Sequence, residues 1–226
     1  MKKLFLWPVF GLLAIALIGA SATISFASDE STRVDKAGRT LQSAVSSKEI
    51  PPSVLKDAYG VAIIPEYWKA ALLGGWEHGN GVLMVQQGPD KWSDPSFISV
   101  SGGSLGAQVG FESSDMILVF RNKDAVNKLL AGRFELGADA TVAAGPAGAK
   151  AQGTTIHEDV LAYVRTQGGF IGASVSGTVI SVDEDGNSAF YGMKNVTPQM
   201  IFAGQVKAPK AAQDLRATLE KLTATA

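Results

Sequence analysis

A serine in a G-x-S-x-G motif is the residue whose surroundings come closest to a catalytic pattern. The sequence Gly-Gly-Ser-Leu-Gly places Ser104 where serine hydrolases carry their nucleophile. His157 is the candidate base, and Asp115 or Asp139 is the candidate acid. The motif works on a strand-to-helix turn, whereas the residues that follow Ser104 alternate in the manner of a strand. A serine esterase that uses Ser104 is therefore an alternative, and a glycine-rich strand is the favoured interpretation.

The other polar residues do not predict a metal or phosphate site. The two histidines, His78 and His157, stand far apart in the sequence, and the chain has no cysteine. Residues 183–187 begin like a calcium loop, but Lys194 occupies the twelfth position, where such a loop carries a glutamate. We interpret this segment as an acidic hairpin loop. Residues 145–150 contain glycine and lysine without the spacing of a phosphate-binding loop. We expect no metal, no cofactor and no catalysis.

The composition favours a folded domain with a bent sheet. Of the 226 residues, 46% are hydrophobic and 25 are glycine, so the chain can form a core and has many positions for turns and close backbone contacts. The absence of cysteine means that no disulfide stabilises the fold. The formal net charge of −1 provides no overall field to attract nucleic acid, which we exclude as an expected partner.

The first residues have the pattern of a secretory signal peptide. Lys2 and Lys3 precede an apolar run over residues 4–18, and small residues lead up to Ala27. We expect a signal peptidase to cleave after Ala27. The alternative is an uncleaved membrane anchor, since the apolar stretch is just long enough to span a bilayer.

Cleavage would divide the chain into a signal peptide, residues 1–27, and a single domain, residues 28–226. Loss of Lys2 and Lys3 from the 20 basic residues leaves 18, against 21 acidic residues, and a net charge of −3. A protein processed in this way is exported, and we expect it in the periplasm, associated with the envelope, or secreted. Attraction to an anionic surface would then have to come from a local patch of charge.

Short, glycine-punctuated strands between terminal helices predict an α+β fold. Strands this close in sequence pair as antiparallel neighbours, because a parallel crossover needs a dozen or more residues. We expect a curved, largely antiparallel β-sheet or partial barrel or sandwich with covering N- and C-terminal helices. The Gly-Asn-Gly sequence at residues 79–81 predicts a hairpin turn, and Pro65 is expected to end the first strand. The expected helices are residues 29–49, 53–59, 122–130 and a closing segment from residue 209, and the expected strands are residues 60–64, 82–87, 97–100, 105–111, 116–120, 134–144, 160–165, 170–182 and 189–191.

Basic residues on the first predicted helix are candidates for membrane contact, namely Arg33, Lys36, Arg39 and Lys48. A basic side on an amphipathic helix can lie on an anionic bilayer surface. Candidates for interfacial anchors are the tryptophans Trp68, Trp76 and Trp92, with Lys69 and Lys91 nearby. The plainer interpretation is a helix that packs on the sheet with a mixed solvated face, and tryptophans in or at the rim of the core.

Short segments of the central chain occur in a characteristic order, at residues 60–65, 69–70 with 74–75, 79–83, 92–97, 101–110, 115–120, and 136–140 with 144–146. In this order they resemble the SYLF domain, and the resemblance covers about residues 30–205. The SYLF family comprises the lipid-binding and actin-binding domains of yeast and animal endocytic proteins, with many exported bacterial members.

The resemblance implies a non-enzymatic membrane-binding module. Eukaryotic members of the family bind phosphoinositides, some bind or bundle actin filaments, and their lipid contact is attributed largely to a basic amphipathic N-terminal helix. By position and character, that role falls here on the helix from Arg33 to Lys48. For an exported member the implied partner is an anionic phospholipid membrane surface, with actin a partner by family analogy alone. The resemblance also assigns Ser104 to a glycine-rich structural strand.

The sequence therefore predicts an exported protein of SYLF type that binds phospholipid surfaces peripherally and without catalysis. One alternative is an envelope carrier that holds a hydrophobic ligand in a pocket enclosed by the sheet. The other is the serine esterase with Ser104 as its nucleophile.

Overall fold

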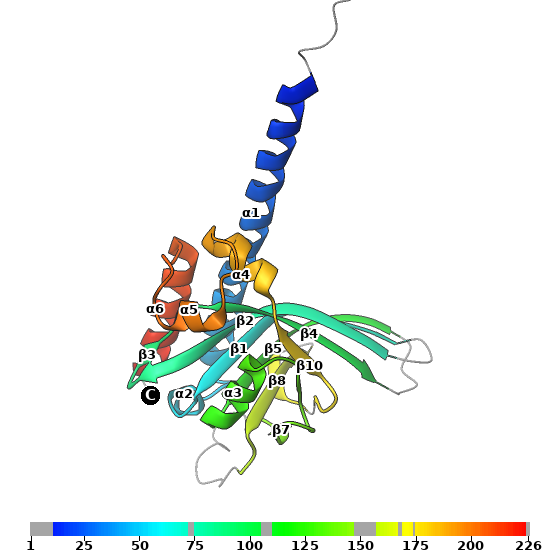
Figure 1. Ribbon diagram of the computed structural model, residues 1–226. Helices are drawn as coiled ribbons and strands as arrows, with labels where there is room; N and C mark the ends of the chain where they lie inside the picture. The colour runs from blue at the N-terminus through cyan, green and yellow to red at the C-terminus, as the bar shows by residue number, and fades with distance from the viewer. Residues whose placement is uncertain are drawn as a thin grey trace, which may run out of the picture.

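The computed structural model describes residues 11–71, 75–104, 110–146, 157–166, 169–173 and 175–224. Side chains are described over the same ranges except at residues 11–28, 69–71, 75–76, 103–104, 110–112 and 166. In these ranges, helices from both ends of the chain pack on a strongly curled sheet (Figure 1).

The described helices are α1 (Gly11–Ser46), α2 (Pro52–Lys56), α3 (Lys123–Leu130), α4 (Glu184–Tyr191), α5 (Pro198–Phe202) and α6 (Lys210–Ala224). The N-terminal half of α1 extends away from the body, while its C-terminal half lies against the sheet and beside α6 (Figure 1). The closing helix and the helix at residues 122–130 are confirmed. The latter begins at Lys123, with the Asn122 side chain as its N-cap.

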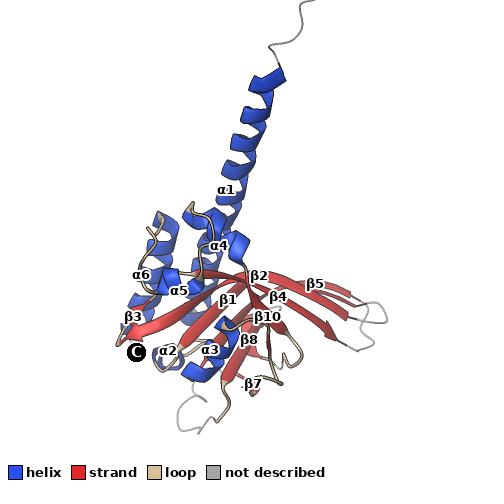
Figure 2. Cartoon of the chain, in the orientation of Figure 1, coloured by secondary structure: helices blue, strands red, loops and turns tan. Residues whose placement is uncertain are grey.

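The described strands are β1 (Gly60–Ala71), β2 (Gly75–Gly88), β3 (Lys91–Trp92), β4 (Ser96–Ser104), β5 (Gly110–Phe120), β6 (Phe134–Glu135), β7 (Val142–Ala144), β8 (Val160–Thr166), β9 (Gly169–Gly172) and β10 (Val179–Val182). They form one sheet in the order β6-β10-β4-β2-β1-β5-β8-β7, with β3 beside β2 and β9 beside β8. Neighbouring strands are antiparallel except for the parallel pair β7–β8. Figure 2 shows how this sheet curls beneath the helices. The prediction of an α+β fold with a curved, largely antiparallel sheet is confirmed.

The central strands are buried on both faces. In β1, Val61 and Ile63 belong to the core shared with the terminal helices, and Ala62 and Ile64 belong to a second core on the opposite face. Strand β5 alternates in the same way over residues 116–120. Because both faces are buried, the sequences of these strands are continuous apolar runs and do not alternate between polar and apolar residues.

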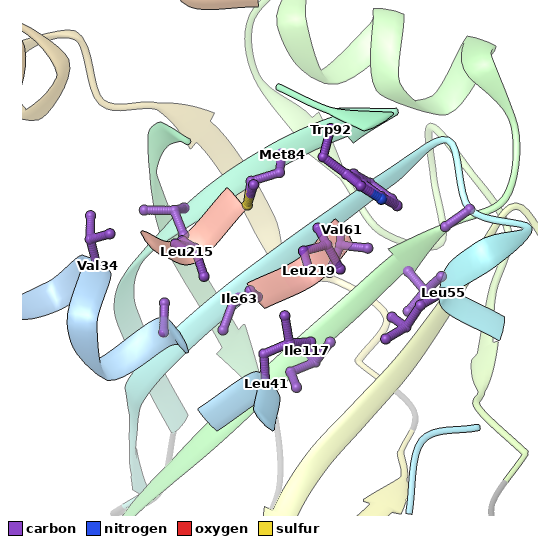
Figure 3. Packing of buried hydrophobic residues seen from close by; sticks show 14 of the residues in the cluster. Val34, Leu41, Leu55, Val61, Ile63, Met84, Trp92, Ile117, Leu215 and Leu219 are labelled. Carbon is purple, nitrogen blue, oxygen red and sulfur yellow. The ribbon is translucent and has the colours of Figure 1, made fainter. Parts of the chain in front are cut away.

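The first core lies between the sheet and the terminal helices (Figure 3). Val34 and Leu41 of α1 and Leu215 and Leu219 of α6 contribute to it, and all four side chains are buried. Their spacing of seven residues in α1 and four residues in α6 places them on one side of each helix. The predicted amphipathic character of both helices therefore corresponds to packing on the sheet.

The second core fills the inside of the curl. The rings of Phe120 on β5 and Phe134 on β6 lie with their centroids 6.0 Å apart, although several strands separate β5 from β6 in the sheet order. Leu129 of α3 and Val126 complete this cluster and are also buried. Packed side chains thus occupy the region in which a carrier would hold its ligand.

One predicted hairpin turn and one predicted strand end are wrong, because the chain continues in strands at both places. Residues 79–81 lie inside β2, and Pro65 lies inside β1 instead of ending it. A β-bulge in β1 accommodates the proline, which has no N–H to donate to a neighbouring strand. Gly79 and Gly81 face this bulge. A Cβ at Gly81 would clash with the carbonyl oxygen of Ile63 and lie 2.8 Å from Ile64 Cγ1.

The predicted acidic hairpin at residues 183–186 and the strand at residues 189–191 are also wrong, since these residues form the start and the end of α4. The Asp183 side chain caps the helix by accepting a hydrogen bond from Gly186 N at 2.8 Å. Two acidic residues in the first turn favour the positive end of the helix dipole. Gly192 ends the helix in a left-handed conformation, at φ 68°.

Other predicted boundaries shift. Residues 134–144 contain the separate strands β6 and β7, and residues 170–182 contain most of β9 and all of β10. Residues 105–109 of the predicted strand 105–111 lie outside the described residues. The first helix, predicted over residues 29–49, spans Gly11–Ser46 in the structure. Among residues with described side chains, no helix combines the length and apolar character needed to cross a membrane.

An ion pair fixes α6 to the loop before β4. Arg216 Nη1 donates to Asp94 Oδ1 at 2.6 Å, and the Asp94 side chain is only 8% exposed. Burial raises the pKa of Asp94 above its ordinary value, and Arg216 partly opposes this effect. The carboxylate therefore depends on Arg216 whenever it is ionised.

We predict that Gly81→Ala lowers the free energy of unfolding by about 1–3 kcal/mol, because the added Cβ meets the backbone of β1. Urea unfolding measures the change. Gly88→Ala is the matched control in the same strand, since a Cβ there has no atom within 4 Å, and we expect a change within about 0.5 kcal/mol. Equal losses for both variants would contradict the prediction.

We also predict that Arg216→Met lowers the free energy of unfolding by about 1–3 kcal/mol near pH 7.5, because an ionised Asp94 is left buried without its partner. The loss should shrink as the pH falls toward the raised pKa of Asp94, where the carboxyl is neutral and needs no cation. Urea unfolding at two pH values measures this. Lys210→Met removes an 85% exposed partner of Asp214 and should change stability little at either pH.

Candidate functional site

Two neighbouring hollows lie where α1 crosses β1, and both are lined by Lys36, Pro65 and Glu66. The first, of about 280 Å³, adds Asp29, Thr32, Arg33, Trp68, His78, Gly79 and Asn80. The second, of about 380 Å³, adds Arg39, Thr40, Ser43, Asp115 and Arg165. Four basic side chains from α1 and β8 therefore gather around one position of β1, the bulge at Glu66.

The bulge inserts one extra residue into β1. Ile64 pairs with Met116 and Tyr67 with Ser114, so that Pro65 and Glu66 together oppose the single residue Asp115 of β5. Glu66 adopts φ 62°, a left-handed conformation that is unfavourable for a residue other than glycine. Its N–H donates to Asp115 Oδ1 at 3.2 Å, which fixes the backbone of the bulge. Such strained, bulged positions are frequent beside functional sites.

Carboxylates accompany the basic side chains on α1. Lys36 Nζ donates to Glu66 Oε1 at 2.6 Å, and Arg33 Nη1 donates to Glu30 Oε2 at 2.5 Å. Burial raises the pKa of Glu30, while the Arg33 charge acts in the opposite direction. The guanidinium of Arg33 also lies 5.7 Å from the centre of the Phe97 ring. Two of the cations on α1 are thus turned toward the sheet and matched by acids.

Asp115 connects α1 to two strands. Its carboxylate accepts a hydrogen bond from Thr40 Oγ1 at 3.3 Å and lies 3.3 Å from Arg165 Nε. The guanidinium of Arg165 is placed 4.7 Å from the centre of the Phe170 ring. Asp115 therefore links the helix, the bulge and β8, and it holds Arg165 at the edge of the second hollow.

The structure brings together three of the six predicted membrane-contact residues. Arg33, Lys36 and the 41% exposed Trp68 line the first hollow. Arg39 is exposed and lies in the second hollow, where it forms no ion pair with the described residues. Lys48 is exposed, lies in the turn after the end of α1 and lines neither hollow. The side chain of Lys69 lies outside the described residues.

Sequence reasoning missed Glu66 and Arg165 as site residues and assigned Asp115 and His78 only to other chemistry. His78 is the direct cross-strand partner of Trp68, and Arg165 follows the residue that pairs with Met116. Both placements depend on strand register, which the spacing of residues along the chain does not reveal. The unusual Pro65 within an apolar strand was the one sequence signal for a bulge.

The residues considered for a serine esterase have other surroundings. The backbone of Ser104 pairs with Gly75 at the end of β4, and the next described element is another strand, β5. The side chain of Ser104 lies outside the described residues. Asp115 takes part in the contacts at the bulge, and Asp139 accepts a hydrogen bond from Glu135 N at 2.7 Å. Among the described residues, β4 is followed by a strand and not by the helix that a nucleophile elbow requires.

The described side chains include no group of three or more His, Asp or Glu residues that could hold a metal ion. The chemistry that the hollows support is instead electrostatic. Guanidinium and ammonium groups near an exposed indole can bind anionic oxygens at the boundary between water and an apolar phase.

Comparison with known proteins identifies the family that this chain resembles. The family described as "Ysc84: Las17-binding protein actin regulator" matches residues 101–222. The protein YSC84 of Saccharomyces cerevisiae is 36% identical over 198 residues, which cover 82% of this chain and 42% of the yeast protein. LAS seventeen-binding protein 3 of the same species is 36% identical over 177 residues, or 76% of this chain and 38% of that protein. The human SH3 domain-containing YSC84-like protein 1 is 31% identical over 180 residues, or 78% of this chain and 52% of the human protein.

The chain spans about half, or less, of the length of these curated relatives. No solved structure gives a significant match. The family match extends over more than half of the chain, and the relatives align with most of it. The resemblance noted in the sequence is thereby confirmed, and the chain belongs to the Ysc84 family, the family of the SYLF domain.

Proposed function

We propose that this protein binds anionic phospholipid surfaces peripherally, without catalysis, through the junction of α1 with β1. The convergence of Arg33, Lys36 and Trp68 on one hollow carries the proposal. A cation near an anionic bilayer surface contributes about 1 kcal/mol to binding. An exposed indole supplies the second contribution, since it is suited to the boundary between headgroups and acyl chains.

The attraction to an anionic surface comes from a local group of basic residues, because the net charge of the whole chain is slightly negative. Arg39 is exposed beside the second hollow, and Arg165 extends the basic surface from α1 onto the sheet. Glu30, Glu66 and Asp115 offset part of this charge at short range, opposite Arg33, Lys36 and Arg165 respectively. Binding should therefore be weak to moderate and sensitive to salt, which screens exposed charges beyond about 10 Å at 0.1 M ionic strength.

A carrier of hydrophobic ligands has less support. The inside of the curl is occupied by packed side chains such as Phe120, Phe134 and Leu129. A ligand there would have to displace part of this core, at a cost comparable to that of a large core substitution. Surface binding requires no such rearrangement.

An actin-related protein partner is the second candidate. The family description names an actin regulator, and one yeast relative is named a binding protein of LAS seventeen. The family match begins at residue 101 and so includes Asp115 and Arg165 but none of α1. The alignments with the yeast relatives cover 76% to 82% of the chain and so extend well beyond this match.

Export is part of the proposal and rests on the signal-peptide pattern of residues 1–27. The expected location is the periplasm or the envelope, or the medium after secretion. Mass spectrometry of the protein recovered from its native cells should give a chain that begins at Ser28. A chain that retains residue 1 would contradict cleavage and favour the membrane anchor.

We predict that the protein cosediments with vesicles containing anionic phospholipid at low salt and that binding falls as salt rises. Arg39→Gln should weaken binding about fivefold, because it removes one exposed cation. Trp68→Ala should weaken binding at low and high salt, because the indole contribution is apolar. Lys210→Gln on α6 removes the same charge from an 85% exposed position and serves as the control.

The composition of the vesicles and a parallel assay decide between the candidates. Absence of binding at low salt, or binding indifferent to the anionic lipid content, would overturn the lipid proposal. Sedimentation with actin filaments in the same buffer, without sedimentation with vesicles, would favour the actin-related partner instead.

A further inference from the structure

Glu66 places a carboxylate at the position where the proposed site would receive an anionic group. Its Oε1 lies 2.6 Å from Lys36 Nζ, and both hollows border the pair. A carboxylate oxygen and a phosphate oxygen make the same kind of charge-assisted hydrogen bond to an ammonium group. Glu66 therefore marks an anion position that is occupied by the chain itself.

The backbone of Glu66 is fixed independently of its side chain. Asp115 accepts the Glu66 N–H, and Asp115 is itself held by Thr40 and Arg165. The strand register also fixes the bulge on both sides. The side chain, in contrast, is 54% exposed, and that of Lys36 is 37% exposed. The carboxylate can thus leave Lys36 while the bulge keeps its shape.

Replacing the Lys36–Glu66 ion pair by a contact between Lys36 and an external anion costs little free energy. Exposed pairs of this kind contribute little net stability, because water and salt screen them and two long side chains must be ordered. An external anion that takes the place of Glu66 makes an equivalent contact with Lys36. The released carboxylate regains its hydration.

We infer that Glu66 is an internal competitor that occupies the anion position at Lys36 and that an anionic phosphate group at a membrane surface displaces it. The inference rests on the proposed function and adds its regulation: the affinity for anionic surfaces is set below the value that the basic residues alone would give. The bulge is the device that holds the competing carboxylate at this position.

Vesicle binding of Glu66→Gln tests the inference. We expect about fivefold tighter binding to vesicles of phosphatidylcholine with anionic phosphatidylglycerol, because Lys36 is released for the surface. Asp214→Asn is the matched control. It also removes one carboxylate from an ion pair with an exposed lysine, Lys210, but on α6 and away from the hollows, and we expect less than about a twofold change.

The Lys36→Gln background separates displacement from a general change of charge. If Glu66 acts by occupying Lys36, adding Glu66→Gln to Lys36→Gln should give no further gain. A gain of the same size in both backgrounds, or equal gains for Glu66→Gln and Asp214→Asn, would overturn the inference while wild-type binding still supported the proposed function. Loss of binding by every variant and by the wild type would overturn both.

A second variant tests whether the gain in vesicle binding by Glu66→Gln comes from a change in folding. Glu66→Gly removes the same carboxylate and suits the left-handed backbone at φ 62°. It should reproduce the gain of Glu66→Gln with equal or higher stability in urea. If the two variants differ in direction, the effect belongs to the backbone of the bulge and not to the carboxylate, and the inference fails.

Discussion

Burial of the central strands on both faces is the constraint on which the rest of the structure depends. Val61 and Ile63 of β1 must be shielded from water on one face of the sheet, and Ala62 and Ile64 on the other. The terminal helices pack against the first face, and the curl of the sheet together with α3 encloses the second (Figure 2). Apolar area of this extent contributes far more to folding than the exposed ion pairs do. With no cysteine in the chain, packing must hold these layers together.

This packing, more than any ion pair, places the candidate site. Val34 and Leu41 fix the rotation of α1 on the sheet, and that rotation brings Lys36 to Glu66 and Arg33 to the hollow beside Trp68. The carboxylates near these cations then set how much charge the surface presents. Helix α1 carries three basic and three acidic residues, and the tertiary structure decides which of its cations remain exposed.

The bulge in β1 connects sequence features that seemed unrelated. Pro65 cannot donate a hydrogen bond to a neighbouring strand, Gly79 and Gly81 leave room opposite it, and Asp115 accepts the Glu66 N–H. The Gly-Asn-Gly sequence suggested a hairpin turn because such turns need glycine for its backbone conformation. In β2 the same glycines are required for space, since a Cβ would strike β1. Local sequence alone does not distinguish these two reasons for glycine.

The sequence by itself determined the terminal helices with a run of strands between them, the apolar faces of α1 and α6, and membership of the family, because periodicity and ordered motifs are properties of the chain. It did not reveal α4 or the continuous length of β1 and β2. It did single out Arg33, Lys36 and Trp68. Only the tertiary structure decided that these three share one hollow and that Glu66 and Arg165 join them. Strand register and the bulge bring Glu66 and Asp115, 30 and 75 positions away from their partners on α1, into contact with that helix. A shift of one residue would turn each side chain to the opposite face.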